Sequence, residues 1–507
     1  VRVSTCTAGS TNCAAVATPL ARQTYFYDGL GRLMYHYRLI PQEGSTVALR
    51  RFDYNGMGWK SFESEWHRDG EVITSGTRWQ EYDPFGRPLR VQAADGKITT
   101  FAYTGVRVTT RTVSVATSLS AESSVSTVEE YDRQGRLVKV DEPSGPSGAR
   151  VATTYTYNVL GKLASATTSS GGVSQTRQWS YDGRGFMTAE RLPEKGASGN
   201  GWVLYQSFDA LGNPGRVIDG PNDLSFAYDK AARPIQVTET ATGRVLKSFT
   251  YGTANVGSDM RKGKLIQAVA NNYYDPANAS ANFQVVETFA YSGTGGKISQ
   301  KTTTLGVVGG YVGTFTQNFG WNDLWELSWQ TYPTKAGLPS RTLSYDYSFG
   351  FLTAVREGGQ TYASMVYHPN GMVAKRSRSN GTNDVVLPDL NRMPRPANIQ
   401  VQSSAGSVLW QTGTYAFDGA GNVKAMGTDR FVYDGVLRLV QANVGGQSFQ
   451  ATYNAFGFLT GIKTGAGRRL LRTLRGRRTG FREPPTTLRV PCFPGEGGAL
   501  PGILRGA

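Results

Sequence analysis

Long apolar runs and cysteine are scarce in this chain of 507 residues. No stretch approaches the roughly 18 apolar residues that a membrane-spanning helix needs, so we expect no membrane span. The three cysteines, Cys6, Cys13 and Cys492, are too few for a disulfide framework or a four-thiolate zinc site, and only Cys6 and Cys13 lie close enough in sequence to suggest a pair. The three histidines lie far apart. We therefore assign no metal ligand and no cofactor.

Signatures of helices and of enzymes are also missing. Segments rich in Leu, Ala, Glu and Lys with a helical period are not found, whereas 62 glycines and 26 tyrosines favour turns and strands. There is no Gly-x-Ser-x-Gly nucleophile elbow. The glycine-rich stretch at 293–299 has Ile298 where a phosphate-binding loop needs a hydroxyl for magnesium. We assign no catalytic residue and expect a protein that is not an enzyme.

The net charge of +16 is unevenly placed. Residues 468–507 contain nine Arg and two Glu, which gives 9 − 2 = +7 and leaves +9 for the rest of the chain. The rest shows no basic cluster, so its charge is interpreted as a solubility feature and we expect no specific nucleic-acid partner.

What the chain has is a repeated motif. The stretch YDGLGRL begins at Tyr27 and recurs as YDPFGRPL at Tyr82, YDRQGRLV at Tyr131 and YDGRGFM at Tyr181. Asn replaces Asp in copies such as YNGMGW, Phe replaces Tyr in FDALGN and FDGAGN, and YDKAARPI and YDGVLRL lack the glycine. A repeat of roughly 20–50 residues is typical of a stacked architecture.

Each motif predicts a strand, a tight turn and a second strand. The Asp takes the first position of a type I turn, where its carboxylate accepts a backbone N–H two residues further on. The Gly takes the left-handed position of a bulged hairpin loop. The residues before and after the turn pack across the hairpin. The predicted structural turn residues are Tyr27, Asp28, Gly31, Tyr82, Asp83, Gly86, Tyr131, Asp132, Gly135, Tyr181, Asp182 and Gly185.

Between the motifs, hydrophobic and polar residues alternate, which places one face of each strand against a neighbour. Single hairpins are marginal, so the repeats must be stable as an array. We expect an all-β fold: a spiralling antiparallel sheet of these hairpins, with tyrosines stacked in ladders, as part of a hollow β-shell. The expected division is a lead-in of uncertain structure at 1–23, the repeat array at 24–464 and a tail at 465–507. The stretch at 377–398 is interpreted as a long surface loop, with an insertion that carries contacts as the alternative.

This series of Tyr-Asp motifs resembles the RHS (YD-repeat) family, which includes bacterial polymorphic toxins, the cocoon of insecticidal toxin complexes and the shell of teneurins. The resemblance covers most of the chain. It implies a spiralling sheet that closes into a hollow shell and, in bacterial members, encloses a C-terminal toxic domain. It also implies a secreted or cell-surface protein. Its partners would be its own toxin domain or neighbouring shell repeats.

The family's self-cleavage motif, Asp-Pro-x-Gly-Leu, is not found after Tyr453. We therefore transfer no autoproteolytic residue and expect the sequence to be a fragment without its toxin domain. The Arg-, Gly- and Pro-rich tail has three open interpretations: an out-of-frame gene end, a disordered linker or a basic nucleic-acid-binding segment.

Three functions compete at this point. The leading hypothesis is a non-enzymatic shell segment that contains and delivers a toxin. The second is a surface adhesion or carbohydrate-binding module, because exposed aromatic side chains stack on sugar rings. The third, an enzyme with a site near 384–395, depends on that segment alone.

Overall fold

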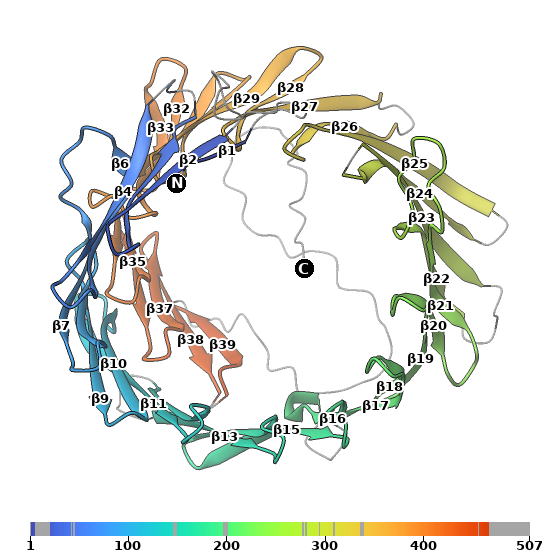
Figure 1. The fold of residues 1–507 in the computed structure, drawn as a ribbon, viewed down its shortest axis with the longest axis horizontal. Helices are drawn as coiled ribbons and strands as arrows, with labels where there is room; N and C mark the ends of the chain where they lie inside the picture. Colours follow the sequence, from blue (N-terminus) through green and yellow to red (C-terminus); the bar gives the residue numbers. More distant parts are fainter. Residues whose placement is uncertain are drawn as a thin grey trace.

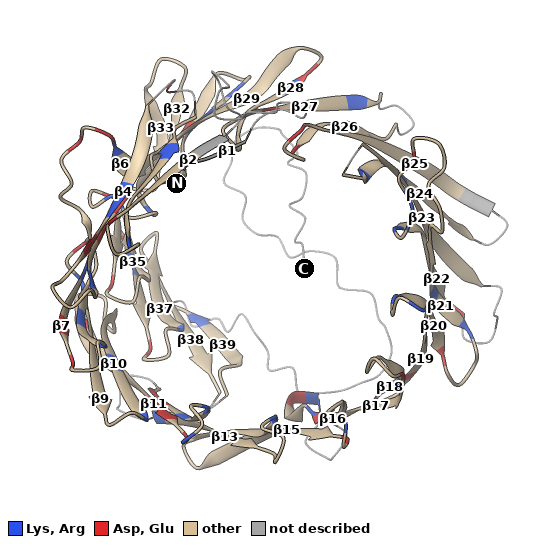
Figure 2. Cartoon of the chain, viewed as in Figure 1, with Lys and Arg blue, Asp and Glu red and all other residues tan. Residues whose placement is uncertain are grey.

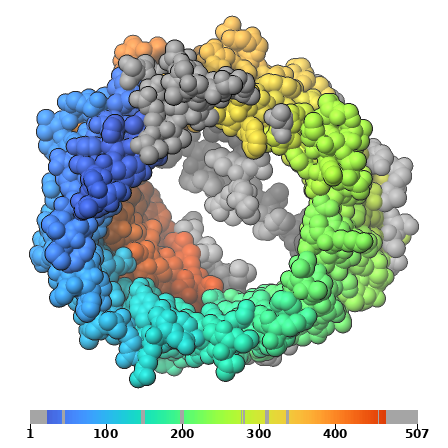
Figure 3. Space-filling view, viewed as in Figure 1, coloured from blue at the N-terminus to red at the C-terminus, as the bar shows by residue number. Residues whose placement is uncertain are grey.

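A computed structural model shows a ring-shaped wall of antiparallel strands around an open centre (Figure 1, Figure 3). The structure describes residues 2–5, 21–41, 43, 46–144, 150–195, 201–275, 278, 281–293, 295–307, 310–334, 339–454 and 456–465. The predicted pair Cys6 and Cys13, Cys492, and all of the predicted tail after residue 465 lie outside these residues. In the described part, the one helical element is a single 3-10 turn, η2 (Pro193–Lys195).

The first part of the wall contains the earliest repeats. Its strands are β1 (Arg2–Thr5), β2 (Ala21–Tyr27), β3 (Leu33–Leu39), β4 (Val47–Tyr54), β5 (Lys60–Ser64), β6 (His67–Arg68), β7 (Gly76–Tyr82), β8 (Pro88–Gln92), β9 (Ile98–Thr104), β10 (Val108–Ala116), β11 (Glu122–Tyr131), β12 (Leu137–Pro143) and β13 (Arg150–Tyr157). β4 pairs with both β5 and β6, and β5 pairs with β7. β1 pairs with β2, so part of the expected lead-in joins the sheet.

From β7 to β33 each strand pairs with the next one along the chain, which gives a continuous meander. Its further strands are β14 (Leu163–Ser170), β15 (Val173–Tyr181), β16 (Met187–Arg191), β17 (Trp202–Phe208), β18 (Pro214–Asp219), β19 (Asn222–Tyr228), β20 (Pro234–Glu239), β21 (Val245–Tyr251), β22 (Leu265–Tyr273), β23 (Asn282–Ser292), β24 (Lys297–Val307), β25 (Gly310–Trp321), β26 (Leu327–Tyr332), β27 (Arg341–Ser348), β28 (Phe351–Glu357), β29 (Gln360–Tyr367), β30 (Val373–Arg378), β31 (Thr382–Pro388), β32 (Pro396–Ser403) and β33 (Val408–Gln411).

A second, six-stranded sheet follows. It consists of β34 (Tyr415–Phe417), β35 (Val423–Met426), β36 (Asp429–Tyr433), β37 (Leu439–Val444), β38 (Gln447–Tyr453) and β39 (Leu459–Thr464). This sheet lies beside β10 and β11 (Figure 1). Following the ribbon in Figure 1, we call β1 to β27 the first winding of the spiral and β28 to β39 the second. The all-β fold and its antiparallel spiral are therefore as the sequence predicted.

The segment at 377–398 differs from the predicted surface loop. It contains β31 and the start of β32, which pair from Thr382↔Ser403 to Pro388↔Pro396. The connection, Asp389 to Arg395, folds as an enlarged YD turn, with a 2.8 Å hydrogen bond from the Arg392 N–H to the Asp389 carbonyl. The high Asn, Pro and Arg content reflects this turn and its contacts with the first winding, so the interpretation as a surface loop was wrong.

Burial is concentrated where the two windings meet. Val113, Val115 and Val125 of the first winding form a buried cluster, and Ala420 and Tyr433 of the second winding pack against it. Elsewhere the wall is one sheet thick, and most of its side chains are only half-buried. The core of the protein is therefore the contact between windings.

Candidate functional site: the YD turns and the seam between windings

The YD turns share one hydrogen-bond pattern. One carboxylate oxygen of Asp28 accepts the N–H groups of Leu30 and Arg32, both at 2.9 Å, and the Gly31 N–H donates to the Asp28 carbonyl at 3.0 Å. Gly31 has φ +77°. A β-bulge separates Phe26 from Tyr27, which lies opposite Leu33. These contacts make the turn self-contained, because every polar group of the Asp has a local partner.

The other three predicted turns have the same geometry. Oδ1 of Asp83, Asp132 and Asp182 each accepts two backbone N–H groups at 2.8–3.0 Å. The glycines at the left-handed position are Gly86 (φ +80°), Gly135 (φ +77°) and Gly185 (φ +85°). The backbone N–H of Arg136, followed by its side chain, lowers the pKa of Asp132. A carboxylate held this way is a turn former and a poor proton acceptor.

Turns that lack glycine keep the left-handed conformation. Ala232 has φ +60°, Trp325 +63°, Arg392 +62° and Leu437 +65°, each three residues after the turn Asp or Asn. A side chain at this conformation costs roughly 1 kcal/mol relative to glycine. The repeat contacts around the turn are therefore strong enough to impose the conformation on an unfavourable residue.

The Arg of the motif has a role that the sequence analysis missed. The Arg136 Nε donates to Asp132 at 2.7 Å, and its guanidinium lies over the ring of Tyr157 in the next repeat, 4.5 Å from the centroid. The Tyr157 hydroxyl then donates to the carbonyl of Leu137 at 2.7 Å. This repeat therefore holds the tyrosine of the next repeat by a cation and by a carbonyl.

This inter-repeat contact recurs along the wall. Arg32 lies over Tyr54, Arg233 over Tyr251 and Arg438 over Tyr453, at 4.1–4.7 Å. The hydroxyls of those tyrosines donate to the carbonyls of Leu33, Pro234 and Leu439. Where the residue after the turn glycine is aromatic, as at Trp59 and Phe186, it contacts the next aromatic ring directly.

The predicted ladder of stacked tyrosines therefore differs in the structure, because other side chains alternate with the tyrosines. Among the ring contacts of the described residues, successive motif tyrosines do not stack on each other, and the side chain after the turn glycine lies between them. Of the predicted tyrosines, Tyr82 and Tyr181 donate to the carbonyls of Lys60 and Leu163. Tyr131 donates instead to the Glu129 carboxylate at 2.6 Å. Tyr27 is 48% exposed.

The second functional feature is the seam, which we define as the contacts between the first and second windings. It begins at Arg38 of β3, whose guanidinium lies 4.1 Å from the Trp66 ring and 5.7 Å from the Phe351 ring. The same side chain donates to the Pro369 carbonyl in a YD turn of the second winding. A half-buried cation between two aromatic rings thus joins segments more than 300 residues apart in sequence.

Ion pairs continue the seam. Arg392 pairs with Glu71, Arg395 with Asp95 at 2.8 Å and Lys424 with Glu122 at 2.6 Å. In each pair the carboxylate belongs to the first winding and the cation to the second. Arg395 also bonds Asp389 and lies 4.1 Å from the Phe417 ring, so it is held on three sides. The Arg395 and Asp95 side chains are only 16% and 10% exposed, and a pair this protected from solvent contributes more than an exposed one.

The Asp418 turn makes the deepest contact of the seam. Asp418 is 1% exposed, and its Oδ2 accepts the backbone N–H of Ala116 at 3.0 Å. The motif Arg is replaced here by Asn422, whose amide reaches both carboxylate oxygens of Asp418. At Gly419 a Cβ atom would lie 2.9 Å from the Ser114 carbonyl oxygen. The small residue lets the turn approach the wall closely.

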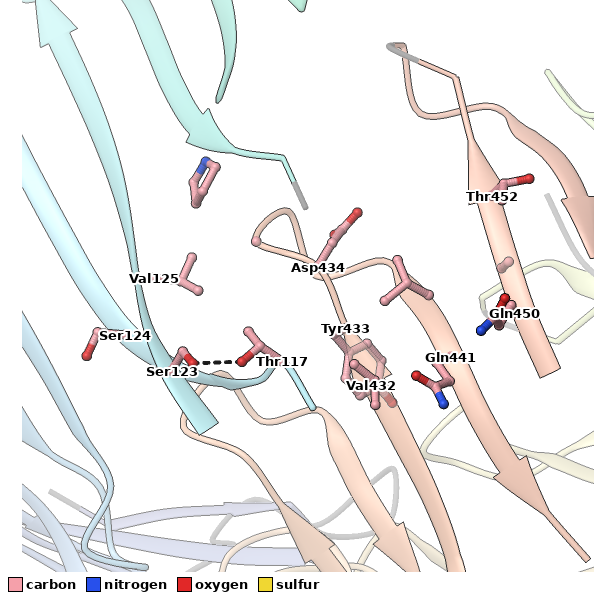
Figure 4. Close-up of a pocket in the computed structure, with 14 residues that line it drawn as sticks. Thr117, Ser123, Ser124, Val125, Val432, Tyr433, Asp434, Gln441, Gln450 and Thr452 are labelled. Carbon is pink, nitrogen blue, oxygen red and sulfur yellow. Dashed lines mark hydrogen bonds between the residues drawn. The ribbon is translucent and has the colours of Figure 1, made fainter. Parts of the chain in front are cut away.

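Beside this contact a cavity of about 590 Å³ separates β36–β38 from β10–β12 (Figure 4). Thr117 and Ser123 face it and share a 2.8 Å hydrogen bond, and Gln441 and Gln450 line the opposite side. Asp434 at its edge is fully engaged by its own turn and by Arg438. The rest of the lining combines polar side chains with Val125, Pro143, Val432 and Val440.

No described feature suggests a metal, a membrane span or a nucleic-acid surface. In the described ranges, no group of three or more His, Cys, Asp and Glu side chains is placed to hold a metal ion. Within the same residues, no helix is long and apolar enough to cross a bilayer. Basic and acidic side chains are interspersed along the described wall (Figure 2).

Comparisons with known proteins agree with the repeat and the fold. The family model described as RHS Repeat matches residues 131–174. No curated protein matches the chain. A crystal structure of TcdB2-TccC3-Cdc42 is similar to this chain, with a TM-score of 0.69 at 15% identity. The matched region covers 89% of this chain and 26% of the chain in that crystal structure. A structure of the Photorhabdus luminescens Tc holotoxin pore with a TccC3 mutation has a TM-score of 0.55 at 15% identity and covers 88% and 25%.

The chain spans about a quarter of the length of these solved chains. At 15% identity, the structural likeness establishes the fold alone, which is that of a β-shell. The RHS Repeat match and this fold agree with each other: the matched residues are one repeat of the wall, and the described wall is similar to the shells of these solved structures. Both findings support a structural role in a shell wall.

Proposed function

We propose that the chain is a wall section of an exported RHS-type shell that encloses and delivers a C-terminal toxic domain. The observation that carries the proposal is the seam, because wall sections that only display a surface have no need to close on themselves. Arg38, Asp418 and the three ion pairs hold the second winding against the first, around an open centre (Figure 3).

Two further observations support a container that is not itself an enzyme. The motif carboxylates are bonded within their own turns, so they are not available as general acids or bases. The matched solved structures belong to Tc toxin proteins, which fits an exported toxin shell. The toxic domain would occupy the space that the wall surrounds.

Electron cryomicroscopy of the full product of the natural gene tests the proposal. We expect a hollow shell with additional density inside it, and we expect that deleting the sequence that encodes the internal density leaves an empty shell of the same outline. A shell without internal density, or a compact particle without a hollow, would contradict the proposal.

A second candidate function is carbohydrate binding at the cell surface. It is favoured by exposed aromatic side chains, since Trp325 is 54% and Trp410 is 56% exposed. Such rings stack on sugars. A glycan array probed with the protein and with Trp410→Ala tests this function: glycan signals lost in the variant support it, and an array without signals, or with signals that the variant retains, counts against it.

A further inference from the structure

The chain has three histidines in all, and the fold brings them to one place in the seam. His36 lies on β3, His67 on β6 and His368 in a YD turn of the second winding. The His36 ring meets the Trp66 ring edge-on, with 5.0 Å between the centroids, and Trp66 directly precedes His67. Trp66 and His368 line the same cleft of about 280 Å³. We call these four side chains the histidine cluster.

His67 is held in the cluster as a neutral side chain. It is 2% exposed. Its Nδ1 lies 2.9 Å from the carbonyl oxygen of Glu65, which can only accept, so Nδ1 carries the hydrogen. Its Nε2 is then an acceptor that is buried without a partner among the described residues. A proton added at Nε2 would create a charged donor in a place where no described group accepts it.

The segment that carries His67 departs from the regular meander. β5 pairs with β7, and residues 65–75 between them form an excursion in which β6 pairs with β4. This excursion, which we call the latch segment, contacts the second winding: Glu71 pairs with Arg392, and the Ser75 hydroxyl donates to the Asn391 carbonyl. Because the β5–β7 pairing lies outside the latch segment, the segment can release the second winding while the wall stays paired.

The charged groups that face His36 are cations. Arg38 and Arg50 lie beside it, and their guanidinium groups are 4.1 and 5.8 Å from the Trp66 ring that His36 also contacts. Burial, followed by these two cations, lowers the pKa of His36. From β2, Tyr25 stacks on the His36 ring with 4.4 Å between the centroids.

The groups that face His67 come from both windings. Burial is the largest cause that lowers the pKa of His67, and Arg392 of the second winding lowers it further. The hydrogen bond to the Glu65 carbonyl, together with the charges of Glu71 and Asp69, opposes this change without reversing it. A proton on His67 is therefore disfavoured by burial and by the cation that closes the seam.

The carboxylates around the cluster are engaged by arginines, in the pairs Glu43–Arg68, Glu63–Arg50 and Glu71–Arg392. Burial opposes the charge of Glu71, but hydrogen bonds from Arg392 and Arg68 outweigh burial and lower the pKa of Glu71. The Glu71 carboxylate therefore keeps its charge in mild acid. Glu65 acts in the opposite direction to the histidines, because burial raises its pKa.

From this arrangement we propose that the histidine cluster is an acid-sensitive latch, which holds the two windings together while its histidines are neutral and releases them when the histidines are protonated. A proton on His36 adds a cation beside Arg38 and Arg50. A proton on His67 adds a buried charge beside Arg392. The latch segment then separates from the second winding and exposes Trp66. This inference concerns the wall and is independent of what the wall encloses.

The sign of the effect follows from the two lowered pKa values. Folding lowers the pKa of His36 and of His67 from 6.5, so the closed seam binds fewer protons than the open seam. The contribution of the cluster to stability is complete above pH 6.5 and is lost as the pH falls below it. Protonation of Glu65 reduces this loss, because its pKa is raised.

Hydroxyl-radical footprinting of Trp66 tests the latch, because the rate of oxidation reports the exposure of a side chain. The folded chain is pulsed with radicals at pH 7.5 and at pH 5.5, and mass spectrometry measures the products. Trp179 of β15, half-buried like Trp66, is the internal control. We expect the oxidation of Trp66 to rise at least about threefold at pH 5.5 while that of Trp179 stays unchanged. An unchanged Trp66, or an equal rise at Trp179, would overturn the proposal.

Substitutions identify the titrating groups. His67→Asn keeps an N–H for the Glu65 carbonyl and cannot gain a proton in this range, and His67→Phe keeps a ring of similar size. We expect both variants to lose most of the response of Trp66 to acid. Glu65→Gln is the matched control, and we expect it to keep the response. A full response in both His67 variants, or a response that Glu65→Gln also removes, would overturn the proposal.

Discussion

The guanidinium of Arg136 lies over the ring of Tyr157, while the hydroxyl of Tyr157 donates to the carbonyl of Leu137, the residue after that arginine. One tyrosine is thus bound by two consecutive residues of the preceding repeat. The pair explains why Arg and an apolar residue follow the turn glycine in so many copies. It also makes each repeat dependent on its neighbour, as expected for an array that is stable only as a whole.

Removal of the Tyr157 hydroxyl tests this contact. We expect Tyr157→Phe to lower the free energy of unfolding by about 1 kcal/mol, because the Leu137 carbonyl loses its partner in a partly buried place. Urea titration followed by fluorescence measures the change. Tyr27→Phe is the control, since the Tyr27 hydroxyl makes no hydrogen bond with the part of the chain that the structure describes, and we expect a change within about 0.5 kcal/mol. Equal losses in both variants would contradict the role of the hydroxyl.

A methyl group at Gly419 tests the close approach of the windings. Gly419→Ala places a Cβ against Ser114, and we expect a loss of about 1–3 kcal/mol because the second winding must move away. Gly183→Ala, at the same motif position in a first-winding turn with open space, is expected to be neutral or slightly stabilising. Hydrogen exchange at the Ala116 amide is the second measurement, and it should accelerate only in Gly419→Ala.

Because of the seam, the stability of the protein depends on pH below about pH 5. Burial opposes the charged form of Glu122, but hydrogen bonds from Lys424, Lys97 and Ser114 outweigh burial and lower the pKa of Glu122 from 4.5 to about 2. A pKa lowered by folding means that the stability is present above pH 4.5 and is lost as the pH falls toward 2.

We therefore expect Glu122→Gln to be less stable than the natural chain at pH 7, by about 3 kcal/mol at most, with the difference shrinking between pH 5 and pH 2. Thermal melts across this range measure it. A difference between the two proteins that does not change with pH would show that Glu122 is not the titrating group.

The turn at Ala232 offers a stabilising substitution. Ala232 has φ +60°, so Ala232→Gly removes the cost of a left-handed alanine and should stabilise the chain by about 1 kcal/mol. Ala231→Gly, one residue earlier and not left-handed, should cost about 0.5 kcal/mol. Denaturant midpoints compare the two, and a destabilised Ala232→Gly would mean that the turn does not need the left-handed residue.

The turn and the spiral are predictable from sequence because their causes are local. Asp28 and Gly31 are three residues apart, and their conformations follow from turn chemistry alone. The contact of Arg136 with Tyr157 is also within reach of sequence reasoning, because Arg recurs after the turn glycine. The assignment of the twelve turn residues as a structural site, and the division of the chain at residues 23 and 464, stay predictions.

The seam was not predictable in this way. Asp418 and Asp209 both begin turns that have Asn four residues later, yet only Asp418 reaches a distant strand. The local sequence predicts the same hydrogen bonds within both turns. The difference arises because the spiral places Ala116 beside Asp418, and that placement depends on the accumulated curvature of the strands between them. The contacts of the 377–398 segment with the first winding depend on the same long-range geometry, so its composition alone suggested a surface loop.

The central claim is that the second winding closes against the first. A zero-length carbodiimide cross-link tests it most directly, because this reagent joins an amine and a carboxylate only when they touch. Lys424 and Glu122 are 2.6 Å apart and 302 residues apart in sequence. We predict a Lys424–Glu122 cross-link within single chains at low protein concentration, and its absence from the folded protein would contradict the closed wall.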